Sequence, residues 1–428
     1  MDKKSILKEN EISAKETINL LKNDKKNISF LDIRERKEYV HGFAFGSVNC
    51  PLSKFKYLIR ELVPDFNTTL ILIGFKNNIQ IIQIHKILKK LKYSSTYIVK
   101  GDYKNWKKHK FPLWAGEYTF SKAFGEWIEI TSNIKNLHAQ DLYKIHKKNH
   151  NYLQIDARPK KEFEKFSLPQ SVQCSGGELP CYINNKENLR KNYIVHCAGR
   201  TRSIIAYQTL KDFDFNNKKY VLNGGTQNWV LSGFDRKFKN QSKIKSTKIN
   251  YKDDLKLANS VAKKFKIPLT QIKNKNANLY NFQINSEIKN FKKIAGWKQV
   301  NATTLIQSTD KFISSTNTKV LIFSNIPSSA VFAVIWLRRM GYQAIWQKRN
   351  ACKIKKTYKL TKSDPTYFFA KRHHGNKSDS KSYLNWEHSL IPTIKKWGCK
   401  NPWISANQKN LSKVQHSLHK IYKNFKAI

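Results

Sequence analysis

A segment of the chain recurs about 124 residues later, and this repeat limits the possible folds more than any other feature. An Asp, an Arg, a Glu and an aromatic residue keep this offset: Asp32, Arg34, Glu38 and Tyr39 recur as Asp156, Arg158, Glu162 and Phe163. The Ser-Val-x-Cys run of residues 47–50 recurs at 171–174, and Gly101 and Trp106 recur as Gly224 and Trp229 at an offset of 123. A match of this length with one deletion indicates a duplicated domain.

Each copy alternates short apolar runs with stretches of helical periodicity. In the second copy we predict buried strands over 152–155, 193–195 and 219–222, and a helix over 203–212. The first copy repeats the scheme, with a strand over 70–73 and a helix over 79–91. Alternation of this kind predicts an α/β fold, in which a parallel sheet is flanked by helices.

A weaker third copy follows a polar, Lys-rich linker at 240–250. We predict helices over 255–265 and 329–340, the second ending at Gly341, and strands over 279–284 and 320–323. The segment after 350 contains a polar stretch and an amphipathic helix near the terminus, and is expected to be a tail or a remnant of a fourth module. The predicted domains are therefore 11–116, 130–236 and 250–350, followed by 351–428.

The net charge of +50 suggests a polyanion partner at first sight, because basic surfaces release counterions from a phosphate backbone. Only 12 of the 80 basic residues are arginine, however, and the lysines are scattered through every predicted element. The joint excess of Lys, Asn and Ile is typical of an AT-rich coding sequence. We therefore do not expect a nucleic-acid partner, although the charge should attract small anions.

Composition also bears on the compartment. No window reaches the roughly 18 uninterrupted apolar residues of a membrane span, and no apolar signal core follows the basic N-terminus. The six cysteines show neither the spacing of a disulfide framework nor that of a zinc site, and His373 and His374 lack further ligands nearby. We expect a cytoplasmic protein with no membrane partner, no metal and no cofactor.

The strongest chemical signal follows the strand at 193–195. The chain there reads His196-Cys197-Ala198-Gly199-Arg200-Thr201-Arg202-Ser203 and then enters a helix. Parallel strand ends are where α/β sheets bind ligands, and the amides and dipole of a helix N-terminus favour anions. A thiol in this place is expected to be a thiolate and therefore nucleophilic. The alternative is that Cys197 is a small buried apolar residue, but packing would not select a glycine and two arginines around it.

Taken together, these motifs resemble the rhodanese sulfurtransferases. The resemblance rests on Asp-x-Arg before a Glu and an aromatic residue, on Ser-Val-x-Cys, on a strand that leads into Cys-x-Gly-Arg-x-Arg-Ser, and on residues 221–225 with Trp229. It covers residues 11–236 as two tandem modules and 250–350 only loosely. The chain is similar to long bacterial proteins in which several rhodanese modules are fused and few keep the cysteine. The resemblance implies tandem modules, each a parallel sheet flanked by helices.

The same resemblance implies a role for each residue of the loop. Cys197 takes the position of the catalytic cysteine, which accepts a sulfane sulfur and holds it as a persulfide. Arg200 and Arg202 would bind an anionic donor such as thiosulfate, and cyanide, a thiol or an acceptor protein would then remove the sulfur. The backbone amides after the cysteine would cradle the outer sulfur, so the expected substrate-binding residues are Ala198, Gly199, Arg200, Thr201, Arg202 and Ser203. The common family loop has Arg directly after the cysteine, where this chain has Ala198.

The other two modules lack the cysteine. Alignment on the strand places Gly74 at its position in module 11–116 and Ser324 in module 250–350. Glycine has no nucleophile, and a serine with no adjacent base cannot form a persulfide. Both modules are predicted to be catalytically silent, and they would wall the cleft, dock a partner or stabilise the assembly.

Three residues near Cys197 have expected roles outside the loop, and two alternative functions remain. Asp156 and Arg158 are interpreted as a structural brace, and His196 either tunes the thiol or is simply packed. A cysteine phosphatase would need Cys-x5-Arg, which requires arginine at position 203, where the chain has serine. A binding or sensing scaffold without turnover is the other alternative, because two of three modules lack the nucleophile.

Overall fold

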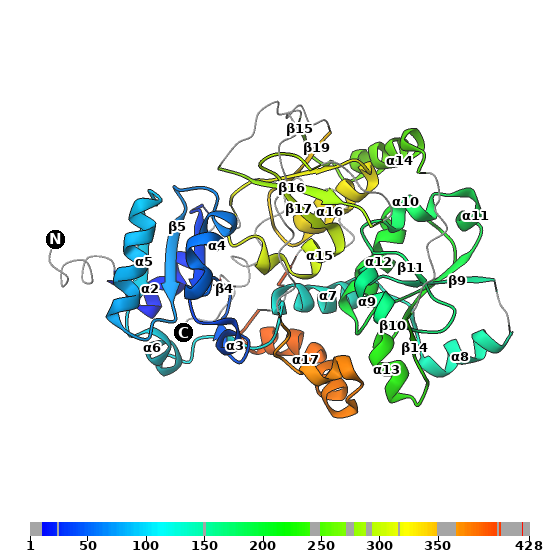
Figure 1. Ribbon diagram of the computed structural model, residues 1–428, viewed down its shortest axis with the longest axis horizontal. Helices are drawn as coiled ribbons and strands as arrows, with labels where there is room; N and C mark the ends of the chain where they lie inside the picture. The colour runs from blue at the N-terminus through cyan, green and yellow to red at the C-terminus, as the bar shows by residue number, and fades with distance from the viewer. Residues whose placement is uncertain are drawn as a thin grey trace.

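The computed structural model describes residues 11–23, 25–148, 151–239, 249–270, 278–287, 293–315, 317–348, 365–399, 402–403 and 422. Most of the predicted linker at 240–250 and most of the chain after 399, where a terminal helix was expected, lie outside these residues. The described chain forms three five-stranded sheets with flanking helices (Figure 1). The predicted α/β class with parallel sheets is therefore confirmed.

Every neighbouring pair of strands in the three sheets is parallel. The first sheet has the order β1 (Glu11–Ile12), β6 (Thr96–Val99), β5 (Thr69–Ile73), β2 (Ile28–Asp32), β4 (Val48–Asn49). The second has the order β8 (Asn136–Leu137), β13 (Lys219–Leu222), β12 (Asn192–His196), β9 (Tyr152–Asp156), β11 (Val172–Gln173). The third has the order β15 (Leu269–Thr270), β19 (Ala344–Gln347), β18 (Val320–Ser324), β16 (Tyr280–Asn285), β17 (Lys298–Asn301).

All three sheets follow one topology. Counted along the chain, the strands of each sheet lie in the order first, fifth, fourth, second, third. The segment with the weakest sequence signal, 250–350, thus builds the same sheet as the two clear repeats. The fourth strand is central in each case and almost wholly buried, which explains why β5, β12 and β18 read as continuous apolar runs.

Helices cover the sheets and connect the strands. The first module contains α2 (Ala14–Leu21), α3 (Arg36–Tyr39), η1 (Leu52–Lys54), α4 (Phe55–Leu62), α5 (Asn78–Lys90) and α6 (Asp102–Lys108). The second contains α8 (Ala139–Lys148), α9 (Lys160–Lys165), α10 (Leu179–Ile183), α11 (Lys186–Leu189), α12 (Thr201–Asp212) and α13 (Gly225–Leu231). The third contains α14 (Tyr251–Lys264), α15 (Ala302–Gln307), η2 (Thr309–Lys311) and α16 (Pro327–Arg339). Antiparallel pairs of β3 (Phe43–Ala44) with β7 (Leu113–Trp114), and of β10 (Phe166–Ser167) with β14 (Lys237–Phe238), border the first two modules.

The duplication extends to individual side chains. Arg34 pairs with Asp32 at 2.6 Å and donates to the carbonyl of the residue eight positions later, and Arg158 does the same with Asp156 at 2.7 Å. The two corresponding tryptophans, Trp106 and the one at 229, are both buried. A brace and a core anchor therefore recur in the same places of both folds.

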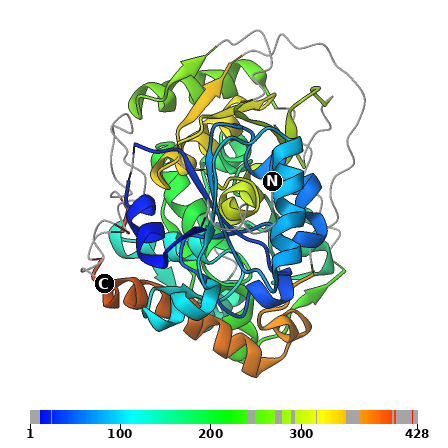
Figure 2. The same cartoon turned by 90° about the vertical axis from the view of Figure 1, so that its left-hand side faces the viewer.

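The three modules pack against one another as one body. The third module lies between the other two in Figure 1, and Figure 2 shows the first sheet, in blue, in front of the rest. Arg339 of α16 forms a buried ion pair with Asp212 of α12 at 2.5 Å, which ties the third module to the second. On the other side, the hydroxyl of Tyr280 donates to the carbonyl of Leu62 in the first module. One apolar cluster runs through all three modules.

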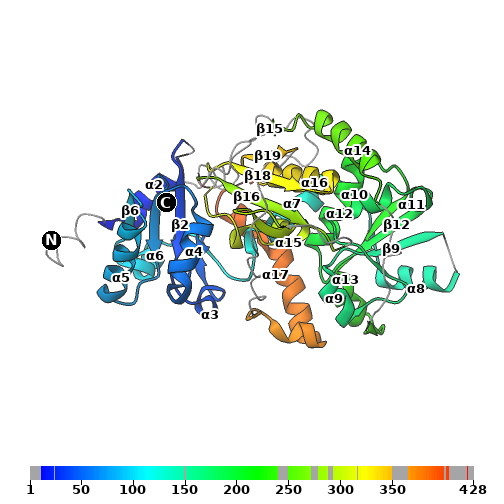
Figure 3. The same cartoon turned by 45° about the horizontal axis from the view of Figure 1, so that its top comes forward.

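Two helices lie outside the repeated sheets. α7 (Thr119–Thr131) connects the first module to the second and is buried along most of its length. α17 (Lys377–Lys396) follows η3 (Ala370–His374) and packs against α7 and α13 (Figure 3). Neither helix was predicted as a part of the site. In the part of the chain that the structure describes, no helix has the length and apolarity that crossing a membrane requires.

Candidate active site

Cys197 is the first residue after the central strand β12, at the carboxyl edge of the second sheet. The helix α12 begins at Thr201, two residues earlier than predicted, so three residues separate the cysteine from the helix. The thiol is 1% exposed and belongs to none of the apolar clusters that the described residues form. Its Sγ lies 3.4 Å from the Oγ of Ser203, which donates at 2.8 Å to the carbonyl of Arg200. The thiol is therefore buried among polar groups.

The backbone around the thiol presents a run of free donors. Among the hydrogen bonds of the described residues, none has an amide of residues 198–203 as its donor. The carbonyls of Cys197 and Ala198 accept from the amides of Thr226 and Gln227 at 2.9 and 3.1 Å, at the start of α13. In a trans peptide the N–H points opposite to the C=O, so the amides of the next residues, 198 and 199, point away from α13. Successive amides at a helix N-terminus suit an anion.

Arg200 is fully engaged with other protein groups. Its Nε donates to Glu126 at 2.7 Å, and its two terminal nitrogens donate to Glu129 and to the Oδ1 of Asn223. The side chain of Arg200 is 5% exposed. Both glutamates belong to α7. Burial raises the pKa of Glu126, while the positive charge of Arg200 opposes that rise. The structure therefore places Arg200 as the link between the loop and α7.

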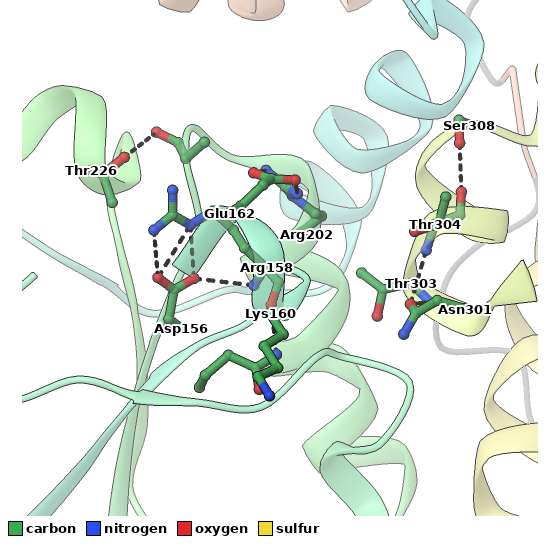
Figure 4. Close-up of polar contacts among 12 residues, drawn as sticks. Asp156, Arg158, Lys160, Glu162, Arg202, Thr226, Asn301, Thr303, Thr304 and Ser308 are labelled. Carbon is green, nitrogen blue, oxygen red and sulfur yellow. Dashed lines mark hydrogen bonds and ion pairs between the residues drawn. The ribbon is translucent and has the colours of Figure 1, made fainter. Parts of the chain in front are cut away.

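Arg202 lies on the other side of the loop. It forms a bidentate pair with Glu162 of α9, with distances of 2.6 and 3.0 Å (Figure 4). Burial lowers the pKa of Arg202, but Glu162 and the nearby Cys197 raise it, and the net effect is a rise. Its guanidinium is thus charged and close enough to the thiol to interact with it electrostatically.

The residues below the thiol form a buried polar layer. The Nε2 of His196 lies 2.7 Å from the Oγ of Ser171, and its Nδ1 has no hydrogen-bond partner among the described residues. Burial lowers the pKa of His196 to about 4, so the ring is neutral at physiological pH. Asp156 is held by Arg158 (Figure 4) and by the hydroxyl of Ser167. Burial would raise the pKa of Asp156, but the charge of Arg158 and the hydrogen bonds from Arg158 and Ser167 are among the effects that together outweigh burial, and the net effect is a lowered pKa.

Sequence reasoning missed the side chains that lie over the loop. Tyr383 and Glu387 of α17 pack on Gly199: a Cβ built on this glycine would meet Glu387 Oε2 at 2.9 Å and Tyr383 Cε1 at 3.3 Å. Lys122 of α7 pairs with Glu387 at 3.0 Å. The apolar residues of α17 at helical spacing, including Leu390 and Ile394, could have predicted a packed helix, but not the surface that it covers.

The corresponding loop of the first module is closed by its own side chains. Gly74, with φ of +99°, donates its amide to the Oδ1 of Asp102 at 2.6 Å. A Cβ on Gly74 would lie 2.6 Å from Asp32 Oδ1 and 2.8 Å from Arg34 Cγ. The brace of this module therefore fills the space in which a cysteine side chain would have to stand.

The third module differs in another way. Ser324 is the last residue of β18, and only residues 325 and 326 separate it from α16. Its Oγ accepts from the amide of Ile326 at 3.1 Å and lies 3.3 Å from the carbonyl of Ile284. Asp254 accepts the amide of Ser328 at 3.0 Å, at the start of α16. The loop is too short to form the cradle that follows β12.

Comparisons with known proteins agree with this architecture. A family profile described as a rhodanese-like domain matches residues 13–109 and 138–232. The structure of a thiosulfate sulfurtransferase from Pseudomonas aeruginosa aligns with a TM-score of 0.70 and 21% identity, covering 83% of this chain and 71% of that chain. At this identity the likeness shows the fold. No curated protein matches this sequence.

Two further solved structures resemble only part of the chain. A protein of unknown function from Rhodopseudomonas palustris, described as a possible tyrosine phosphatase, is 24% identical with a TM-score of 0.23, covering 27% of this chain and 89% of that chain. A rhodanese-related protein from Thermoplasma volcanium is 26% identical with a TM-score of 0.20, covering 24% of this chain and 96% of that chain. Likenesses this partial do not bear on activity.

Proposed function

We propose that this chain, which carries two domains of the rhodanese-like family, is a sulfurtransferase that holds a sulfane sulfur on Cys197. One observation carries the proposal. The thiol stands next to a run of backbone amides, residues 198–203, that have no acceptor among the described residues. Such a set of donors suits a terminal sulfur that bears negative charge, because each N–H can stabilise it without a counter-ion.

The chemistry takes two displacement steps. The Cys197 thiolate attacks the outer sulfur of an anionic donor such as thiosulfate, a sulfur–sulfur bond forms, and the bond to the sulfite group breaks with its electron pair leaving on sulfite. A thiophile, either cyanide or a thiol, then attacks the outer sulfur of the persulfide. The sulfur leaves as thiocyanate or as a new persulfide, and the Cys197 thiolate is restored.

The family resemblance implied that both loop arginines bind the donor, but their contacts give them different roles. Arg202 is the candidate for binding the donor, because it interacts with Cys197 and its partner Glu162 is 38% exposed. Arg200 is occupied by two glutamates and an asparagine, so its part is to hold the loop in shape. The first and third modules would support the fold of the second, since neither offers a thiol in this position.

The test is intact mass after incubation with thiosulfate. The wild type is expected to gain one sulfur, about 32 Da, and to lose it again with cyanide, because a persulfide is a reversible modification. Cys197→Ser is expected to gain nothing. Cys181→Ser is the matched control, because Cys181 is a partly exposed thiol in the same module, and this variant should behave as the wild type.

Intact mass and one activity assay separate the alternatives. Sulfur uptake by Cys197→Ser would contradict the proposal. Failure of the wild type to take up sulfur from thiosulfate, from polysulfide and from a small-molecule persulfide would favour a scaffold without turnover. Hydrolysis of a generic aryl phosphate that depends on Cys197 would favour a phosphatase.

A further inference from the structure

The Cys197 loop is covered by a helix from a distant part of the sequence. α17 packs on the loop through Tyr383 and Glu387, and Leu384 lies over Gly224 at 3.5 Å from a Cβ built there. Both Tyr383 and Glu387 are buried, the second with 1% of its surface exposed. Figure 3 shows α17 beside α13, whose first residues bind the loop carbonyls. A ligand that approaches the loop from this side meets α17.

The buried carboxylate of Glu387 is only half satisfied. Its Oε1 accepts from Tyr383 at 2.8 Å and from Lys122 at 3.0 Å. Its Oε2 has no hydrogen-bond partner among the described residues, and it is the atom that a side chain on Gly199 would strike at 2.9 Å. An acceptor without a donor thus faces a loop that has donors without acceptors. Leaving either group unpaired is unfavourable in a buried setting.

The cover extends to the second arginine of the loop. The guanidinium of Arg372 in η3 lies 4.2 Å from the centre of the Tyr383 ring. The next residue, His373, is close enough to Glu162 and Arg202 to interact with their charges. On the other side, the Nδ1 of His388 lies 3.7 Å from Glu126, a partner of Arg200. The segment from η3 to His388 therefore spans the surroundings of both arginines.

The three modules differ in the carboxylate that lies beside the loop and helix that follow the fourth strand. In the first module Asp102 binds the loop amide, and in the third Asp254 binds an amide of the helix, each by a short hydrogen bond. In the second module the position of Asp102 is Gly225, and the carboxylate that faces the loop belongs to α17. It makes no hydrogen bond to the loop, so moving it away breaks no hydrogen bond of the loop, and its pair with Lys122 of α7 is the contact that holds it in place.

We propose that the part of α17 around Tyr383 and Glu387 is a removable cover on the Cys197 loop, and that Glu387 keeps anions out until the cover moves. This proposal rests on the proposed function only for the identity of the excluded anion, because the position of α17 over the loop does not depend on it. The helix has a place to bend: Pro392 has no N–H, so the carbonyl of His388 lacks its usual helical donor, in the turn after Glu387. Beyond that turn, Ile394 is buried in the main core and anchors the helix.

The test compares two alkylating reagents of one chemistry and different charge. Iodoacetamide is neutral and iodoacetate is an anion, and the rate at Cys197 is read from the mass of its peptide in the full-length protein. Glu387→Gln removes the charge and keeps the shape of the side chain. We expect it to raise the iodoacetate rate about tenfold and the iodoacetamide rate much less, because the carboxylate repels only the anionic reagent. Tyr383→Ala loosens the cover and is expected to raise both rates. Asn385→Ala, on the exposed side of the same helix, should react as the wild type.

Each result decides the proposal. Equal rates in the wild type and in both cover variants, with native melting curves, would show that α17 does not limit access. Slower alkylation or slower sulfur uptake in Glu387→Gln would make Glu387 an activating residue, which also contradicts a cover. Faster alkylation in variants that take up no sulfur would keep the cover and remove the sulfurtransferase. Sulfur uptake that is as fast in the wild type as in the variants would remove the cover and keep the sulfurtransferase.

Discussion

Asp102 and Gly225 occupy the corresponding position of the first and second modules, with φ of +50° and +54°, yet only Asp102 reaches the loop beside it. Its carboxylate binds the amide of Gly74, whereas beside Gly225 no described residue accepts a hydrogen bond from the loop amides. The space at Gly225 is already taken by the loop backbone, because a Cβ there would lie 2.3 Å from the carbonyl oxygen of Cys197. One glycine thus keeps the cradle open and lets α13 approach it.

Gly225→Ala is therefore expected to damage the site. The new Cβ must push the Cys197 peptide, and a non-glycine residue with positive φ costs about 1 kcal/mol more. We expect sulfur uptake to fall at least about tenfold and the free energy of unfolding to fall by about 1–3 kcal/mol. Gly233→Ala is the matched control, because φ is +86° there but no atom of the described residues lies within 4 Å of the Cβ. It should lose only the backbone contribution, and equal effects of both variants on uptake would contradict the argument.

Restoring the cysteine of the first module should not restore a site. In Gly74→Cys the Cβ would meet Asp32 and Arg34 at under 3 Å, where φ is +99°. In a Cys197→Ser background we expect no sulfur uptake from thiosulfate, and a loss of about 1–3 kcal/mol in urea unfolding. A gain of one sulfur on the introduced thiol would show that the brace can yield and that the first module is silent only for want of a nucleophile.

The sequence predicted the parts of the fold that local patterns encode. The strands at 193–195 and 219–222 follow from apolar runs and appear in the structure. Self-similarity indicated the duplicated Asp and Arg residues, and the structure shows an ion pair between them in both copies. The partners of Arg200 could not be predicted, because Glu126 and Glu129 lie on a helix more than 70 residues away, and its burial depends on packing. The position of α17 is of the same kind: amphipathicity indicates that a helix packs, but not on what.

The two loop arginines should respond differently to the same substitution. Arg200→Met leaves Glu126 and Glu129 without their cation in a buried place, so we expect a loss of about 3–5 kcal/mol in the free energy of unfolding. Arg202→Met leaves only Glu162, which is partly exposed, and should cost about 1 kcal/mol or less. The second variant should instead raise the KM for thiosulfate. Urea unfolding and steady-state kinetics measure both effects, and a reversed pattern would exchange the roles of the arginines.

The contact between Arg339 and Asp212 is expected to couple the third module to the second. Both groups are almost fully buried, and the guanidinium donates to both carboxylate oxygens, at 2.5 and 3.0 Å. Asp212→Asn leaves the buried guanidinium of Arg339 without a negatively charged partner, and we expect the free energy of unfolding to fall by about 2–4 kcal/mol. Asp214→Asn removes an exposed pair with Lys264 and should cost under about 1 kcal/mol. Equal losses in thermal unfolding would show that the modules do not depend on the buried pair.

His196 should make the protein less stable in mild acid. Its pKa is about 4 in the folded chain, because burial disfavours the charged ring, and about 6.5 when unfolded. Between these values the unfolded chain binds more protons, so stability contributed by the neutral ring is complete above pH 6.5 and is lost as the pH falls to 4. The free energy of unfolding lost over this pH range is about 3 kcal/mol. His196→Gln, which can still bond Ser171, should flatten that fall.

The measurement is the free energy of urea unfolding at several pH values from 4 to 8, and the difference between the wild type and His196→Gln isolates this residue from the other titrating groups. His138→Gln is the control, since its ring is exposed and its curve should run parallel to that of the wild type. A constant difference between wild type and His196→Gln across this range would mean that the ring is protonated equally in the folded and unfolded chains. The buried layer beneath Cys197 would then be wetter than its contacts indicate.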